Sequence, residues 1–269
     1  MKKRMIAIAA ACALLTAAGC NNNAGTTAAT TEAAATTTTA AAAAEPAAEG
    51  KITGDPISHE DYIAADVETE VIVETYVQGK QSWWEDNGVG KASFYAQNNP
   101  EGGYFFYEMP CTKEEYDQIV PGTKLKVHGY KAEWSGEIEI IDTEFDIISG
   151  DTFIASAEDV TGLLGKDELV DHQNELVSFK GMTVEAANDE GAAFMYKYDN
   201  SGSDGDDLYF NVSKDGTTYT FTVESYLCDK DSQVYSDVKA LNVGDVIDLE
   251  GFLYWYNGAN PHITSVSKA

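Results

Sequence analysis

An internal repeat constrains the fold of this chain more than any other feature. Residues 122–136 (GTKLKVHGYKAEWSG) align without gaps on residues 244–258 (GDVIDLEGFLYWYNG), and glycine occupies the first, eighth and fifteenth positions of both copies. Between the glycines apolar and polar residues alternate, which is typical of a half-buried β-strand. The glycine inside each copy, Gly129 or Gly251, suits the bend that a small barrel needs to close. We therefore predict a β-rich unit duplicated in tandem.

Two further correspondences favour the same interpretation. Ser58 and Ser156 each precede an acidic residue pair, which is the pattern of a helix N-cap. Cys111 and Cys228 each follow a predicted strand and precede a short predicted helix. A duplicated fold accounts for both pairs.

The order of elements within each copy follows from the alternation of apolar residues and from the turn and capping signals. In the first copy, Thr112 to Glu115 form a capping box that predicts a helix ending before Pro121. Strands are predicted there at 71–77, 92–97, 104–109, 124–133 and 137–142. In the second copy, strands are predicted at 175–186, 192–199, 217–226, 245–256 and 259–266, with a helix at 232–241 and an inserted hairpin strand at 208–212.

This order, three strands, a helix and two strands, resembles the OB fold, a five-stranded Greek-key barrel. The resemblance covers about residues 56–267. It implies a mainly β chain of two tandem five-stranded OB-like barrels, each with a short helix between strands 3 and 4. A tandem β-sandwich or a pair of SH3-like barrels is the structural alternative. We place module 1 at residues 51–152 and module 2 at residues 153–269.

Residues 1–20 have the features of an export signal, with basic residues at 2–4 followed by an apolar run. The segment Leu14 to Cys20 (LLTAAGC) resembles the lipobox of bacterial lipoproteins, although Ala17 stands where leucine is commoner. The resemblance implies cleavage before Cys20, acylation of that cysteine with palmitate, and anchoring in the cell membrane on its extracytoplasmic face. The bilayer is then a partner through Cys20. A plain secretory signal is the alternative.

Residues 21–50 consist of Asn, Ala, Thr, Glu and Gly with a single proline, and they contain no aromatic residue. Such a segment buries too little apolar surface to offset the entropy of ordering it. We predict a disordered Ala/Thr-rich tether that separates the folded part from the membrane.

The net charge of the chain narrows the classes of ligand that it is expected to bind. The chain has 45 acidic and 17 basic residues, a formal charge of −28, and Arg4 is its only arginine. Because nucleic-acid binders displace counterions with Lys and Arg, we expect no nucleic-acid partner.

Cys111 and Cys228 are too few for a disulfide framework. A single bridge between them is open to an exported protein, but two buried free thiols are the favoured interpretation.

Aromatic residues gather at the predicted loops that border the ligand face of an OB barrel. Two adjacent tryptophans cannot both point inward from one strand, so at least one of Trp83 and Trp84 is expected to be exposed. The candidate ligand-binding residues are Trp83, Trp84, Trp134, Glu137, Tyr254, Trp255 and Tyr256. Packing of these rings into the ends of the barrels is the competing interpretation.

No catalytic motif, cofactor fingerprint or histidine pair with metal-ligand spacing is present, so we expect no enzyme activity, no cofactor and no metal. The acidic loop at residues 199–207 offers oxygen ligands for calcium, but its spacing is not that of an EF-hand.

Taken together, these features lead us to expect an extracytoplasmic, membrane-anchored binding lipoprotein that presents two OB-like modules to an uncharged ligand such as a glycan or peptide. The alternative is an interaction or scaffold module that docks an envelope protein without any small ligand.

Overall fold

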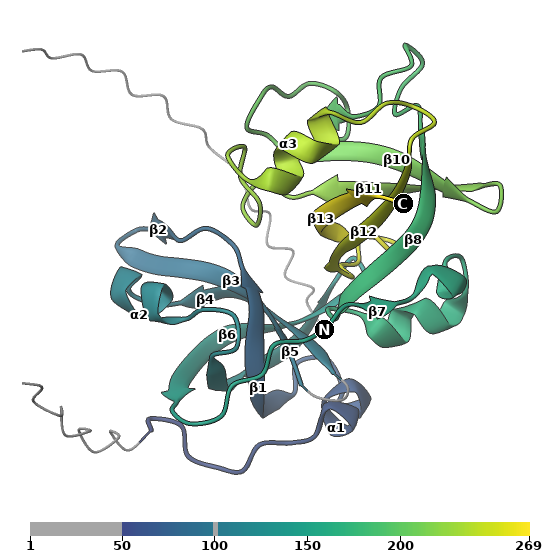
Figure 1. The fold of residues 1–269 in the computed structure, drawn as a ribbon. Coiled ribbons are helices and arrows are strands. Elements are labelled where there is room, and N and C mark those ends of the chain that lie inside the picture. The colour runs from purple at the N-terminus through teal and green to yellow at the C-terminus, as the bar shows by residue number, and fades with distance from the viewer. Residues whose placement is uncertain (1–49, 99–101) are drawn as a thin grey trace, which may run out of the picture. The chain divides into compact units, whose positions relative to one another are not determined.

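A computed structural model describes residues 50–98 and 102–269. The predicted signal, Cys20 and nearly all of the predicted tether lie outside the described residues. The described strands form two sheets, one within residues 70–148 and the other within residues 158–268 (Figure 1). In this part of the chain, no helix combines the length and the apolar character needed to cross a membrane.

The first sheet closes into a five-stranded barrel. Its strands are β1 (Glu70–Lys80), β3 (Val89–Gln97), β4 (Gly103–Pro110), β5 (Lys124–Trp134) and β6 (Glu137–Ile148). β1 pairs antiparallel with both β3 and β5, β3 pairs with β4, β4 runs parallel to β6, and β6 returns to β5. β2 (Trp84–Asp86) adds a short edge strand to β3.

The second sheet repeats these pairings. Its barrel strands are β8 (Leu176–Glu185), β10 (Leu208–Lys214), β11 (Thr217–Val223), β12 (Val246–Phe252) and β13 (His262–Lys268). β8 pairs with β10 and β12, β10 with β11, β11 runs parallel to β13, and β13 pairs with β12. Both barrels therefore have the strand connections of the OB fold. The predicted fold class is confirmed.

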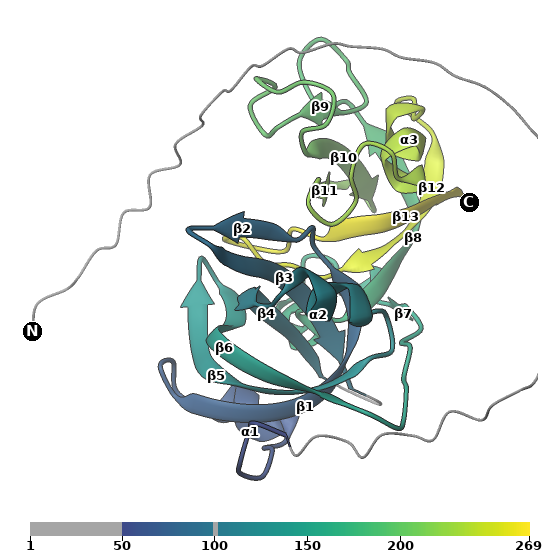
Figure 2. The same ribbon diagram turned by 90° about the vertical axis from the view of Figure 1, so that its left-hand side faces the viewer.

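A short helix lies between the third and fourth strands of each barrel, as predicted. α2 (Lys113–Gln118) begins with a complete capping box, in which Thr112 and Glu115 each bond the other's backbone N–H. α3 (Gln233–Lys239) begins at the N-cap Ser232. Both views show α2 beside the first barrel and α3 beside the second (Figure 1, Figure 2). A further helix, α1 (His59–Ala64), is capped by Ser58 as expected.

The helix expected after Ser156 does not form. Glu158–Asp159 is instead a two-residue strand, β7, parallel to β8, and two 3₁₀ helices follow, η1 (Thr161–Leu163) and η2 (Asp167–His172). Val160 is buried in the second core, and its N–H donates to the carbonyl of Ser178. Burial of this side chain holds the segment extended and overrides the local capping signal.

The second strand of the second barrel is also not where the sequence predicted it. Residues 192–199 contain only the two-residue strand β9 (Met195–Tyr196), and none of these eight residues is fully buried. The position belongs to β10, which was expected to be an inserted hairpin. Its residues Leu208, Phe210 and Val212 alternate with partly exposed residues and are fully buried, so this segment supplies the stronger apolar face.

Each barrel has its own apolar core, and a smaller third cluster joins them. In that cluster Tyr95 of β3 stacks on Phe252 of β12, with ring centroids 4.3 Å apart and an interplanar angle of 2°. Cys111 and Cys228 are both free thiols, as expected; Cys111 is buried, whereas Cys228 is only half-buried. Burial raises the pKa of Cys111 to about 11.

Candidate functional site

The turns that correspond to each other in the sequence repeat meet in the structure. Trp134, the last residue of β5, contacts Tyr256, its counterpart between β12 and β13, with ring centroids 5.1 Å apart. Asn257 donates its N–H to the carbonyl of Ser135 at 2.7 Å. Ser135 and Asn257 both have φ of 54°, in the left-handed region, and a glycine follows each of them. The loops between strands 4 and 5 of the two barrels thus form one joint surface.

A groove of about 560 Å³ runs from this joint along the outer face of β10 and β11. Its walls include the rings of Trp134, Tyr198, Tyr209 and Tyr256. It continues along the strands over Asn211 and other polar side chains. Neither part of this groove is lined by a lysine or an arginine of the described residues.

The alternation of β10 and β11 explains the chemistry of this outer face. The buried residues of β10 point into the barrel, so Tyr209 and Asn211 point outward, opposite Thr222 and Thr220 of β11. The hydroxyl of Thr220 donates to the Asn211 side-chain carbonyl at 2.8 Å, and that of Thr222 donates to Asn260 at 2.8 Å. Strands 2 and 3 form the ligand face of an OB fold. Here that face carries an aromatic ring among neutral hydrogen-bonding groups.

A second hollow, of about 470 Å³, adjoins the groove at three shared residues: Glu224, Tyr254 and His262. The Glu224 carboxylate accepts hydrogen bonds from the N–H groups of Tyr226 and Leu227 and from the Gln81 amide, at 2.9–3.1 Å. Burial raises the pKa of Glu224 to about 7. The rings of Tyr254 and His262 stack beside it, with centroids 4.4 Å apart.

Four of the predicted ligand-binding residues line these hollows. Trp134 and Tyr256 are 53% and 50% exposed and border the groove, while Trp84 is 38% exposed and borders the adjoining hollow. Tyr254 is half-buried and lines both. The structure therefore places these four residues in the walls of two adjoining hollows.

The other three predicted residues line neither of these two hollows and make structural contacts instead. Trp83 packs on the first core and donates its indole N–H to the carbonyl of Cys111 at 3.0 Å. Trp255 packs against the second core. Glu137 is fully buried and accepts the N–H of Trp255 at 2.8 Å, so its carboxylate ties the two turns together. Burial raises the pKa of Glu137 well above its usual range.

Sequence reasoning missed the outer face of the second barrel. Tyr198, Tyr209, Asn260 and Glu224 line the groove, and none of them was predicted. The alternation of apolar and polar residues from Leu208 to Val212 could have identified this strand and its outward-facing residues. Because the second strand was assigned to residues 192–199, that face was not recognised.

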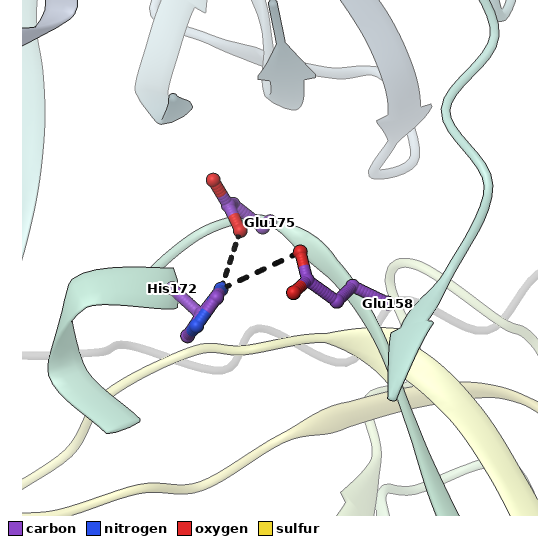
Figure 3. A group of neighbouring side chains, drawn as sticks. All are labelled: Glu158, His172 and Glu175. Atoms are coloured by element: carbon purple, nitrogen blue, oxygen red, sulfur yellow. Dashed lines mark hydrogen bonds and ion pairs between the residues drawn. The ribbon is translucent and has the colours of Figure 1, made fainter. Parts of the chain in front are cut away.

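Figure 3 shows a cluster of Glu158, His172 and Glu175, which the scattered histidine spacing did not indicate. His172 Nδ1 lies 2.9 Å from Glu175 and 3.9 Å from Glu158. The other carboxylate oxygen of Glu175 accepts the N–H of Gly102 at 3.0 Å. The cluster therefore links η2, β7 and the residue before β8 to the first barrel.

The acidic loop at residues 199–207 has partners within the protein. Asp204 forms an ion pair with Lys239, and Asp206 forms one with Lys197. The N–H of Gly205 donates to the hydroxyl of Tyr235 at 2.8 Å. These contacts hold the loop against α3.

No protein family and no curated protein match this chain. Among solved structures, a murine DNA-binding protein bound to double-stranded DNA is 12% identical, covers 74% of this chain and 96% of its own, and has a TM-score of 0.35. The Ifi202 HINa domain with 20-bp double-stranded DNA is 10% identical over 75% of this chain and 96% of its own, with a TM-score of 0.33. A replication protein A heterotrimer bound to single-stranded DNA is 11% identical over 72% and 50%, with a TM-score of 0.31.

These comparisons correct the expectation that the chain has no nucleic-acid partner. The three similar structures described above hold double- or single-stranded DNA, and the expectation is withdrawn. The exclusion depended on the net charge of the whole chain. A net charge does not describe the local surface at which bases stack on aromatic rings in OB folds.

Proposed function

We propose that this chain is an extracytoplasmic, lipid-anchored binding protein that holds an uncharged, hydroxyl-rich ligand, a glycan, in the groove along β10 and β11. The observation that carries the proposal is the outer face of these strands. There Tyr209 lies among threonine and asparagine side chains, and the ring pair of Trp134 and Tyr256 closes one end. Ligand sites in general combine aromatic walls with a few placed polar groups.

The chemistry of the groove suits a sugar in two ways. The apolar face of a pyranose ring can pack on the exposed rings of Trp134 and Tyr256, because both combine a flat apolar surface with a polar edge. Hydroxyl and amide groups such as those of Thr220 and Asn211 are both donors and acceptors, as sugar hydroxyls are. A neutral ligand then meets hydrogen-bonding partners along the whole face.

The anchoring part of the proposal depends on residues 1–20 and is tested separately. Cells that express the protein are grown with an alkyne-tagged palmitate, and the protein is followed by label and by membrane fractionation. We expect label and membrane association in the wild type and the loss of both in Cys20→Ala. An unlabelled wild type found outside the membrane fraction would show that the signal is a plain secretory one. A labelled Cys20→Ala variant would show that the acyl chain is attached to another residue, and would overturn anchoring through Cys20.

Binding is tested by titrating the protein with neutral oligosaccharides while tryptophan fluorescence is recorded. We expect a saturable change, because Trp134 is more than half exposed at the end of the groove. Tyr209→Ala should weaken binding at least tenfold. Tyr130→Ala is the matched control, since Tyr130 is an exposed strand tyrosine of β5 that lines neither hollow.

A single-stranded DNA oligonucleotide is included in the same titration. Saturation by the oligonucleotide that is lost in Tyr209→Ala, with no response to any glycan, would overturn the glycan proposal in favour of a nucleic-acid ligand at the same face. Equal weakening by Tyr209→Ala and Tyr130→Ala would show that the groove is not the binding site.

A further inference from the structure

The hollow beside the groove is walled by aromatic rings. Trp84, Tyr107 and Tyr226 stand at its rim and are 38%, 42% and 63% exposed. Phe105 and Tyr254 lie beneath them, with ring centroids 5.7 Å apart. Phe105 is also 6.4 Å from the ring of Tyr107. Five rings from both barrels thus surround one volume of about 470 Å³.

The wall also carries a carboxyl group, Glu224, that no basic group balances; burial raises its pKa to about 7, and a cation bound beside it would favour its ionised form. All the hydrogen-bond donors to Glu224 are neutral. Among the described residues, no lysine or histidine forms an ion pair with Glu224 at 4.0 Å or less. His262, in the same wall, carries no charge near neutral pH, because burial lowers its pKa to about 3. Glu108 is the other acid of the wall, and it is paired with Lys91 at 3.1 Å.

One of these rings already makes a cation–π contact within the protein. Lys91 Nζ lies 5.2 Å from the centroid of the Trp84 ring. Ring faces attract cations through their quadrupole, most strongly where water is excluded. The rings of Tyr107, Tyr226 and Tyr254 have no such cation in the described residues. The hollow therefore combines aromatic rings over which no cation of the described residues lies with the carboxylate of Glu224.

We propose that this hollow binds an organic ammonium group, held by the faces of Tyr107, Tyr226 and Tyr254 and by the carboxylate of Glu224. The ammonium charge balances Glu224, and its alkyl substituents replace water on the rings. Aromatic walls of this kind recognise quaternary ammonium ions in other proteins. This inference goes beyond the proposed glycan function and does not depend on it.

The test compares two probes of the same shape, choline and 3,3-dimethylbutan-1-ol. The alcohol has a carbon atom in place of the quaternary nitrogen of choline and is therefore uncharged. Isothermal titration of the protein is expected to show saturable heat with choline and none with the neutral alcohol. Higher salt should weaken the binding, since one charge pair contributes to it. Glu224→Gln keeps the shape of the side chain and should weaken choline binding at least tenfold.

Tyr107→Leu is the second variant, because Tyr107 is a rim residue whose loss leaves the buried wall in place. It should weaken choline binding about tenfold and leave glycan binding unchanged. Tyr198→Ala is the control, since Tyr198 lines the groove and not the hollow. The proposal is overturned by an absence of saturable choline heat, by equal binding of the neutral alcohol, or by wild-type affinity in both Glu224→Gln and Tyr107→Leu.

Discussion

Tyr95 of β3 and His262 of β13 form a polar link between the two barrels, with the phenolic oxygen of Tyr95 2.9 Å from His262 Nδ1. Both side chains are buried, at 0% and 6% exposure. The link lies within the third apolar cluster, where Tyr95 also stacks on Phe252. A neutral imidazole is compatible with this environment, and a charged one is not.

This burial predicts a loss of stability in acid. Burial lowers the pKa of His262 to about 3, whereas an unfolded histidine titrates near 6.5. As the pH falls from 6.5 towards 3, the unfolded chain gains a proton that the folded protein does not, so the free energy of unfolding decreases. Urea unfolding of the wild type and of His262→Gln at pH 7 and pH 4 measures this. We expect the wild type to lose roughly 2–3 kcal/mol more than the variant; equal losses would contradict the account.

Glu139 predicts a pH effect of opposite sign. It is 7% exposed, and its side chain makes no hydrogen bond to another of the described residues. Burial, and to a lesser extent Glu108, raise its pKa to about 7. Its contribution to stability is therefore complete below about pH 4.5 and is lost as the pH rises through 7.

Glu139→Gln removes that titration while keeping the shape. At pH 8 the variant should be more stable than the wild type by roughly 2 kcal/mol, and the two should agree within about 0.5 kcal/mol at pH 4. Denaturant melts at both pH values give the difference. A pH-independent difference would show that Glu139 is not the titrating group.

The two adjacent tryptophans provide a matched pair. Trp83→Phe removes the indole N–H that donates to the Cys111 carbonyl and leaves a gap on the first core. We expect it to cost about 1–2 kcal/mol of unfolding free energy. Trp84→Phe, at an exposed position of β2, should change stability by less than about 0.5 kcal/mol. Thermal melts that rank the two variants in the reverse order would contradict the assignment.

The repeated glycine inside each copy gives a further prediction. A Cβ at Gly251 would lie 2.2 Å from the His262 carbonyl oxygen, and one at Gly129 would lie 2.8 Å from that of Ile141. Both glycines stand where the pairing of strands 4 and 5 shifts its register. Gly251→Ala should therefore destabilise the protein by more than about 2 kcal/mol. Gly162→Ala, which would meet nothing within 4 Å, is the control in the same melts.

Local patterns predicted most of the fold, because strand alternation, the capping box at Thr112 and the repeated glycines are each read within a few residues. They failed where contacts between distant segments decide the outcome. Val160 is buried in the second core despite the capping pattern at Ser156. The second strand contains Leu208, Phe210 and Val212 instead of residues 192–199, because these three side chains fill the core.

The candidate site was predicted in part for the same reason. The turn residues Trp134 and Tyr256 follow from the repeat, and the structure brings them together. The burial of Glu137 depends on the joining of two turns that are more than 100 residues apart, since its partner Trp255 is 118 residues away. No single segment carries that information, which is also why Glu224 and Gln81 were not recognised as neighbours.

Glycan binding at the outer face of β10 and β11 is tested most directly by NMR. The backbone amide signals of the protein are followed during titration with a neutral oligosaccharide that binds. We predict saturable shifts that map to residues 208–223 and to the turns at Trp134 and Tyr256. Shifts confined to other strands, or none at saturating ligand, would contradict the account.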